Sequence, residues 1–172
     1  MIPSLTILGL DPGLRHTGWG IVAQDGNRLS FVAAGRISPD AGLPMAARLC
    51  ALAEGLADVI ARYAPMETAI EESFIHKSAS SALKLGQARG AAILTLGQAG
   101  LVVTEYSANR IKQSVTGYGH ADKGQIQAMV TMLLPGSGEL AADAADALAV
   151  AIAHAHHRPM AAIAARAAGV RA

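Results

Sequence analysis

Four acidic residues carry the strongest chemical signal in the sequence. Asp11 and Glu71 each follow a short apolar run, and Asp143 and Asp146 stand three positions apart, so these two share one face if the segment is helical. Carboxylates from distant parts of a chain, with no basic residue beside them, favour a hard divalent cation such as Mg²⁺ or Mn²⁺. One or two such ions activate water and stabilise the leaving oxygen when a phosphodiester is attacked. The four acids therefore predict metal-dependent phosphoryl chemistry.

Single acids among these four also have simpler explanations. Asp11 precedes Pro12 and Gly13, so it can serve only to begin a turn. Asp143 can be a first-turn acid that complements the helix dipole. Glu72 directly follows Glu71, and strand alternation sends the two side chains to opposite faces. From the residues alone, the prediction stops at a divalent-metal site for phosphodiester or phosphoryl chemistry.

The elements that must position these acids follow from the hydrophobic pattern. Runs rich in β-formers predict five strands, at residues 4–10, 17–23, 28–37, 68–70 and 101–104. Apolar residues at helical spacing predict helices at residues 44–63, 78–98, 107–115, 125–134 and 141–157. Three antiparallel strands followed by βαβ units predict an α/β fold, with a mixed five-stranded sheet and helices on both faces.

Length and composition predict one compact domain. The chain has 172 residues, of which 52% are hydrophobic. We expect a single domain over residues 1–158 and a flexible tail over residues 159–172, because the segment after Pro159 has no clear packing face. The one cysteine, Cys50, excludes an internal disulfide and is expected in the core. The N-terminus does not resemble a leader and no apolar run approaches about 20 residues, so we expect a cytoplasmic protein with no membrane segment.

Basic residues are concentrated in the middle of the chain. The segment from His76 to Gly124 has six Lys or Arg and two acids, a net charge of +4, whereas the whole chain is +1, which leaves −3 for the remainder. Such a distribution suits a nuclease that holds phosphates beside a metal site, although on its own it is more often an unevenly charged surface. The six basic residues are Lys77, Lys84, Arg89, Arg110, Lys112 and Lys123.

The motifs, taken in order, resemble one family. Residues 8–13 and 17–20, which read LGLDPG and TGWG, are similar to the opening motif of the RuvC Holliday-junction resolvases. Residues 69–74, 81–90, 112–125 and 143–149 are similar, in the same order, to the later motifs of that family, so the resemblance spans about residues 5–157. It implies a ribonuclease-H-like fold in an enzyme of DNA recombination and repair. It also implies a homodimer that nicks two strands of like polarity at a four-way DNA junction, leaving 5′-phosphate and 3′-hydroxyl ends.

The resemblance implies a role for each acid. Relatives commonly carry an amide where this chain has Glu72, so the register of the motif assigns the ligand role to Glu71. The implied cofactor is Mg²⁺, with Mn²⁺ as a substitute and up to two ions per site. The implied metal ligands, which are also catalytic residues, are Asp11, Glu71, Asp143 and Asp146.

The resemblance also implies contacts to DNA. Lys112 and Lys123 match basic residues near the scissile phosphate, and Lys123, which follows a glycine-rich loop, counts among the catalytic residues. Phe74 matches an aromatic residue that stacks on bases at the opened junction. Lys77, Lys84 and Arg89 complete the expected DNA-binding set. Two branch-migration proteins, RuvA and RuvB, are the implied partners.

Two other function classes remain as alternatives. A sugar-kinase-like or ATP-hydrolysing protein has a related sheet, but 172 residues are too few for its two lobes. A junction-binding scaffold would have an inactive catalytic site, whereas all four acids are present.

The small residues at Ser80, Ala88 and Ala92 predict close packing of helix 78–98 against a second copy. An adventitious metal site is one reading of the three late histidines, but an exposed helix C-terminus is the expected one; they are His154, His156 and His157.

Overall fold

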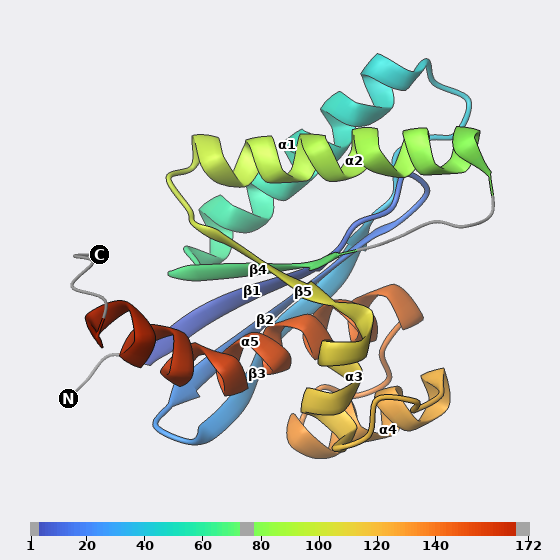
Figure 1. Ribbon diagram of the computed structural model, residues 1–172. Helices are drawn as coiled ribbons and strands as arrows, with labels where there is room; N and C mark the ends of the chain where they lie inside the picture. Colours follow the sequence, from blue (N-terminus) through green and yellow to red (C-terminus); the bar gives the residue numbers. More distant parts are fainter. Residues whose placement is uncertain (1–3, 73–77, 168–172) are drawn as a thin grey trace.

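The structure is a computed structural model that describes residues 4–72 and 78–167. The described residues form five strands and five helices (Figure 1). The strands are β1 (Leu5–Asp11), β2 (Thr17–Asp25), β3 (Arg28–Ile37), β4 (Glu67–Glu72) and β5 (Val103–Ser107). The helices are α1 (Met45–Tyr63), α2 (Ala79–Gln98), α3 (Ala108–Thr116), α4 (Lys123–Leu133) and α5 (Ala142–Ala167). All ten predicted elements are confirmed, and only the last one ends far from its predicted boundary.

The five strands form one mixed sheet in the order β3-β2-β1-β4-β5. The first three strands are antiparallel, whereas β4 runs parallel to both β1 and β5. Helices α1 and α2 cover one face of the sheet, and α5, with α3 and α4 beside it, covers the other (Figure 1). The predicted α/β architecture with helices on both faces is therefore confirmed.

Alternation along β1 and β4 decides which side chains meet which helices. Leu8, Leu10 and Ile70 are fully buried in the cluster beneath α1 and α2. Ile7 and Ala69 belong to the cluster beneath α5. Because successive side chains of a strand point to opposite faces, the α5 face also receives the side chain four positions beyond Ile7 and the side chain two positions beyond Ala69. These side chains belong to Asp11, the last residue of β1, and to Glu71, near the end of β4, so both acids lie on the α5 side of the sheet.

Two glycines let the first half of α5 lie directly on the sheet. A Cβ atom on Gly9 would stand 2.2 Å from the carbonyl oxygen of Ala147, and one on Gly18 would stand 1.9 Å from that of Asp143. Both neighbours are backbone atoms, which cannot yield without moving the helix. The glycines of β1 and β2 thus bring the acidic end of α5 next to the end of β1.

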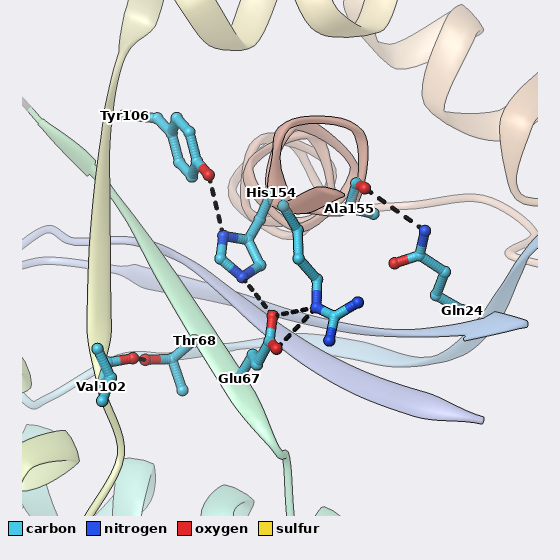
Figure 2. A network of polar contacts seen from close by, with 8 residues as sticks. Gln24, Glu67, Thr68, Val102, Tyr106, His154 and Ala155 are labelled. Carbon is cyan, nitrogen blue, oxygen red and sulfur yellow. Dashed lines mark hydrogen bonds and ion pairs between the residues drawn. The ribbon is translucent and has the colours of Figure 1, made fainter. Parts of the chain in front are cut away.

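The predicted end of the last helix at His157 was wrong, because α5 continues through Pro159 to Ala167. A proline inside a helix has no N–H to donate to the carbonyl four residues earlier, which here belongs to Ala155. The side chain of Gln24 on β2 donates to this carbonyl oxygen at 3.4 Å (Figure 2). The sheet thus supplies a donor that proline lacks, and the helix is not forced to stop. Residues 168–172 of the predicted tail lie outside the described residues, so their flexibility stays a prediction.

Two expectations about helix faces were also wrong. Cys50 on α1 is exposed, whereas Leu52 and Leu56 are the fully buried residues of that helix. Ala88 and Ala92 on α2 are fully buried against the protein's own core, so they cannot face a second copy. Within residues 4–72 and 78–167, no helix is both long and apolar enough to cross a membrane.

Candidate metal centre and active site

A cavity of about 300 Å³ lies where the ends of β1 and β4 meet α3, α4 and α5. Asp11 comes from the last position of β1 and Glu71 from the neighbouring parallel strand. Asp146 comes from the second turn of α5 and faces the same cavity. The lining residues are Asp11, Glu71, Ala108, Ile111, Lys112, Lys123, Ile126, Asp146 and Ala149. The structure therefore brings together three of the four acids and the two lysines that the sequence singled out.

The carboxylates of the cavity repel one another in a poorly solvated place. Burial, followed by the charges of Glu71, Asp146 and Asp143 in that order of effect, raises the pKa of Asp11 from 3.8 to about 7. Burial and the charge of Asp146 likewise raise the pKa of Glu71. Clustered carboxylates with raised pKa values are stabilised by a cation placed among them. The electrostatics of the cavity thus favour a bound divalent ion.

Lys123 forms an ion pair with this cluster. It occupies the first position of α4, where the side chain of Asp122 accepts from the backbone N–H of Gln125 at 2.9 Å and the Gln125 side chain accepts from the N–H of Asp122 at 3.0 Å. Its Nζ lies 3.5 Å from Oδ2 of Asp146, and 80% of its side chain is exposed. The expectation that no basic residue stands beside the acids was therefore wrong. A cation at a helix N-terminus is mildly unfavourable, and the facing acids explain why one is tolerated here.

The donor set fits a hard divalent ion held in an open site. Among the described residues, no three His, Cys, Asp or Glu side chains converge as they do in a closed metal site. Mg²⁺ is commonly held by one or two carboxylates together with water and substrate phosphates rather than by an all-protein cage. A cavity whose candidate metal ligands are the oxygens of three carboxylates matches that mode of binding. Asp143 does not line the cavity, although its charge acts on Asp11.

Arg89, which we expected to contact DNA, is engaged inside the protein. Its guanidinium donates to the backbone carbonyl of Glu71 and to the carboxylate of Glu105, and only 16% of its side chain is exposed. It also lowers the pKa of Glu71, although burial outweighs this effect. Arg89 therefore ties α2 to the middle of β5 and to the backbone of Glu71, which carries one of the cavity carboxylates.

Replacing Arg89 with lysine is expected to weaken metal binding and cleavage by about 10–100-fold, the usual cost of losing a group that orients a ligand. Lysine keeps the charge but lacks the fork that reaches two acceptors at once. The matched control is Lys84→Gln, since Lys84 is exposed on the same helix. Mn²⁺ titration by calorimetry and junction binding by gel shift separate the two variants. An Arg89→Lys protein that binds metal normally and loses only DNA affinity would return Arg89 to the DNA-binding set.

Two residues that hold the chain after Asp11 were not predicted. The hydroxyl of Thr17 donates to the carbonyl of Gly13 at 2.8 Å and accepts from the N–H of Gly13 at 3.3 Å, which closes the turn. Arg48 on α1 donates to the carbonyl of Leu14 at 3.1 Å. The G-x-x-x-T spacing was a usable signal for the first contact. Nothing in the sequence pairs Arg48 with a loop 34 positions away.

The remaining predicted DNA contacts divide into two groups. Lys112 on α3 is half-buried and lines the cavity, and Lys84 on α2 is exposed. Phe74 and Lys77 lie outside the described residues.

Glu72 follows Glu71 on β4, and strand alternation places it on the face away from α5. The geometry therefore agrees with Glu71 as the acid of the cavity.

Comparison with known proteins places the chain in one family. The family model described as crossover junction endodeoxyribonuclease RuvC matches residues 7–154. A protein of that name from Rhodopseudomonas palustris strain TIE-1 is 56% identical over 154 residues, which cover 90% of this chain and 88% of the relative. One from Bradyrhizobium diazoefficiens is 51% identical over 164 residues, or 95% and 94% of the two chains.

A solved structure extends the similarity to three dimensions. The structure of Thermus thermophilus RuvC in complex with a Holliday junction substrate matches with a TM-score of 0.85 at 30% identity. The match covers 91% of this chain and 96% of the other. The mixed sheet and the covering helices are thus the α/β, ribonuclease-H-like fold that the sequence predicted. The chain belongs to the RuvC family of crossover junction endodeoxyribonucleases.

Proposed function

We propose that this protein is a Mg²⁺-dependent endonuclease that resolves four-way DNA junctions by paired, symmetric nicks during recombination and repair. The observation that carries the proposal is the cavity in which three carboxylates face Lys112 and Lys123. Clustered acids suit a metal, and flanking lysines suit the phosphates of a DNA strand. Family membership supports this reading, as does the relative solved with a Holliday junction substrate.

Different side chains have different roles in the proposed phosphodiester hydrolysis. Asp11, Glu71 and Asp146 would hold the metal, with Asp143 at the edge of the group. A bound Mg²⁺, or Mn²⁺ in its place, with up to two ions per site, supplies Lewis-acid charge and lowers the pKa of attacking water. Lys123 is exposed and loosely held, so it can follow the scissile phosphate as charge develops there. The reaction leaves 5′-phosphate and 3′-hydroxyl ends.

Further DNA contacts are proposed for residues around α2 and α3. Lys112 stands in the cavity wall beside the carboxylates, where it would bind a phosphate of the cut strand. Lys84, exposed on α2, would bind the backbone farther from the cut. We keep Phe74 for stacking on an opened base and Lys77 for a phosphate contact, both as expectations from the family resemblance.

A homodimer is proposed because symmetric cuts need two active sites. The face of α2 turned away from the core carries Leu83 and Leu94, which are 64% and 61% exposed and eleven positions apart, or about three turns. Between them, a Cβ on Gly90 would meet nothing within 4 Å, so a partner can approach closely there. This stripe replaces the wrongly predicted face of Ala88 and Ala92. Sedimentation of Leu94→Arg should show a monomer, whereas Val102→Arg, at an exposed position outside α2, should remain a dimer.

The proposed setting follows from the activity. Junctions moved by branch migration are the substrate of such an enzyme, so RuvA and RuvB are the proposed partners, and the cytoplasm is the proposed compartment. Co-sedimentation with a RuvA-bound junction tests the first of these. A protein displaced from the junction by RuvA at all concentrations would contradict it.

The test of the function is cleavage of a synthetic mobile four-way junction in Mg²⁺, with the ends mapped. We expect paired nicks at symmetric positions and no cleavage of linear duplex. Junction binding without cleavage in any divalent metal would support a non-catalytic scaffold. ATP turnover without DNA cleavage would instead support the kinase-like alternative.

A further inference from the structure

A second polar cluster joins α5 to the sheet (Figure 2). It lies at the start of β4, whereas the cavity lies at the other end of that strand. Its members are Glu67 at the start of β4, Tyr106 on β5, and His154 and Arg158 on α5. His154 is only 6% exposed. The expectation of an exposed histidine cluster at a helix C-terminus is therefore wrong for His154, because the helix continues beyond it and its ring lies against the sheet.

The hydrogen bonds of this cluster fix one arrangement of protons. Tyr106 Oη lies 3.0 Å from Nδ1 of His154, and Nε2 of the same ring lies 2.9 Å from Oε2 of Glu67. Burial lowers the pKa of His154 and raises that of Tyr106, so the ring is neutral and the phenol keeps its proton. The phenol then donates to Nδ1, and Nε2–H donates to the carboxylate. Arg158 Nε donates to both oxygens of Glu67, at 2.7 and 2.8 Å.

The cluster and the cavity lie at opposite ends of the same strand and helix. Glu67 precedes Glu71 by four residues on β4, a distance of about 13 Å at the usual strand rise. His154 follows Asp146 by eight residues on α5, about 12 Å at the helical rise. The strand runs toward the cavity and the helix runs away from it. The two spans match, so fixing His154 opposite Glu67 places Asp146 opposite Glu71.

Between these two ends the packing of α5 on β4 is apolar, whereas Gly9 and Gly18 set how closely the helix approaches β1 and β2. The intervening contacts are apolar and involve small side chains, among them Ala69, Val150 and Ala151. Apolar packing is non-directional, whereas the bonds of the histidine have fixed geometry. At the other end the carboxylates repel one another, which tends to push Asp146 away from Glu71. A directional anchor at the far end opposes that displacement.

We propose that Glu67 and His154 are positioning residues that set the register of α5 on β4, and thereby hold Asp146 at its place beside Asp11 and Glu71. The inference rests on the proposed metal-dependent nuclease function and deepens it. It assigns the polar cluster a role in metal affinity through Asp146, 12 Å or so away along the helix, rather than in contact with DNA.

The test compares His154→Leu with Ile152→Val in the full-length protein. Leucine removes both hydrogen bonds of the ring, whereas Ile152→Val removes one methylene from the buried face of the same helix and leaves the cluster intact. Calorimetric titration with Mn²⁺ and junction binding in Ca²⁺ are measured well below the unfolding temperature of each protein. We expect Mn²⁺ affinity to fall about 10–100-fold in His154→Leu, with junction affinity within about twofold and neither quantity changed in Ile152→Val. Glu67→Gln is the second variant, and its Mn²⁺ affinity tests the positioning role if His154→Leu does not fold.

The outcomes separate the two proposals. Wild-type Mn²⁺ affinity in folded His154→Leu or Glu67→Gln, with only a lower unfolding temperature, would overturn the positioning role and leave the nuclease function intact. A wild-type protein that neither binds Mn²⁺ nor cleaves junctions would overturn both. Partial recovery of Mn²⁺ affinity in His154→Gln, whose amide can still donate to Glu67, would support the directional bond as the cause.

Discussion

Asp11→Asn is expected to abolish junction cleavage and, in the same protein, to raise the unfolding temperature of the metal-free form. Cleavage falls because asparagine has no charge with which to hold a divalent ion, and the loss of several kcal/mol of metal assistance corresponds to about 10³-fold or more in rate. Stability rises because the asparagine amide replaces a buried carboxylate that three other acids repel. Activity and stability are thus expected to move in opposite directions.

The pH dependence of this stability gain follows from the pKa of Asp11. In the folded protein it is raised from an ordinary 3.8 to about 7. A raised carboxyl pKa contributes stability that is fully present below the unfolded value and is lost as pH rises through the folded value. Between pH 4 and pH 7 the wild-type protein should therefore lose stability that Asp11→Asn retains. The difference in unfolding temperature should be largest near pH 8 and small near pH 4.

Thermal unfolding in EDTA at several pH values, alongside cleavage in Mg²⁺, measures both effects. Asp58→Asn is the matched control, since Asp58 is exposed on α1 and away from the cavity. It should change neither quantity. Metal should raise the unfolding temperature of the wild-type protein and of Asp58→Asn, and have much less effect on Asp11→Asn. An Asp11→Asn protein that is less stable than wild type at pH 8 would contradict the electrostatic account of the cavity.

The sequence predicted the sheet and the three acids of the cavity for an identifiable reason. Strand alternation and strand order are local rules, so the apolar residues of β1 and β4 were enough to send Asp11 and Glu71 to one edge. The i, i+3 spacing of Asp143 and Asp146 predicted that both lie on one face of a helix. It did not predict that only Asp146 lines the cavity. That choice depends on the rotation of α5, which the close approach at Gly9 and Gly18 decides.

Local sequence rules did not predict the contacts between residues that are far apart in the chain. His154 was predicted to be exposed because it was expected at the C-terminus of the last helix, but its partner Glu67 stands 87 positions earlier. Arg89 looked like a phosphate ligand because it lies in a basic segment, although its side chain turns inward to β4 and β5. Pro159 was predicted to end the helix because proline lacks an N–H donor. The donor that compensates for it, the side chain of Gln24, comes from β2, far away in the sequence. In each case the identity of the partner decided the role, and a single sequence does not supply it.

Lys123→Gln is expected to lower the rate of cleavage about 10²–10³-fold while junction affinity changes by no more than a few-fold. The lysine is exposed and held only by a long ion pair with Asp146, so its removal costs little folding stability. Its charge also lowers the pKa values of Asp11 and Glu71, so both should rise further in the variant and protons should compete more strongly with metal. The Mg²⁺ concentration at half-maximal rate should therefore increase, and more so at pH 6.5 than at pH 8.

Single-turnover cleavage with enzyme in excess separates these effects from DNA binding. Lys84→Gln serves as the opposite case. Its junction affinity should fall and should depend less steeply on salt, since one phosphate contact is removed, while the cleavage rate at saturation is kept. Lys123→Arg should recover part of the rate, because it restores the charge but not the compact ammonium. If Lys123→Gln instead cleaved at the wild-type rate and only bound DNA more weakly, Lys123 would be a backbone contact like Lys84. The carboxylate cavity would then act without a lysine at the reacting phosphate.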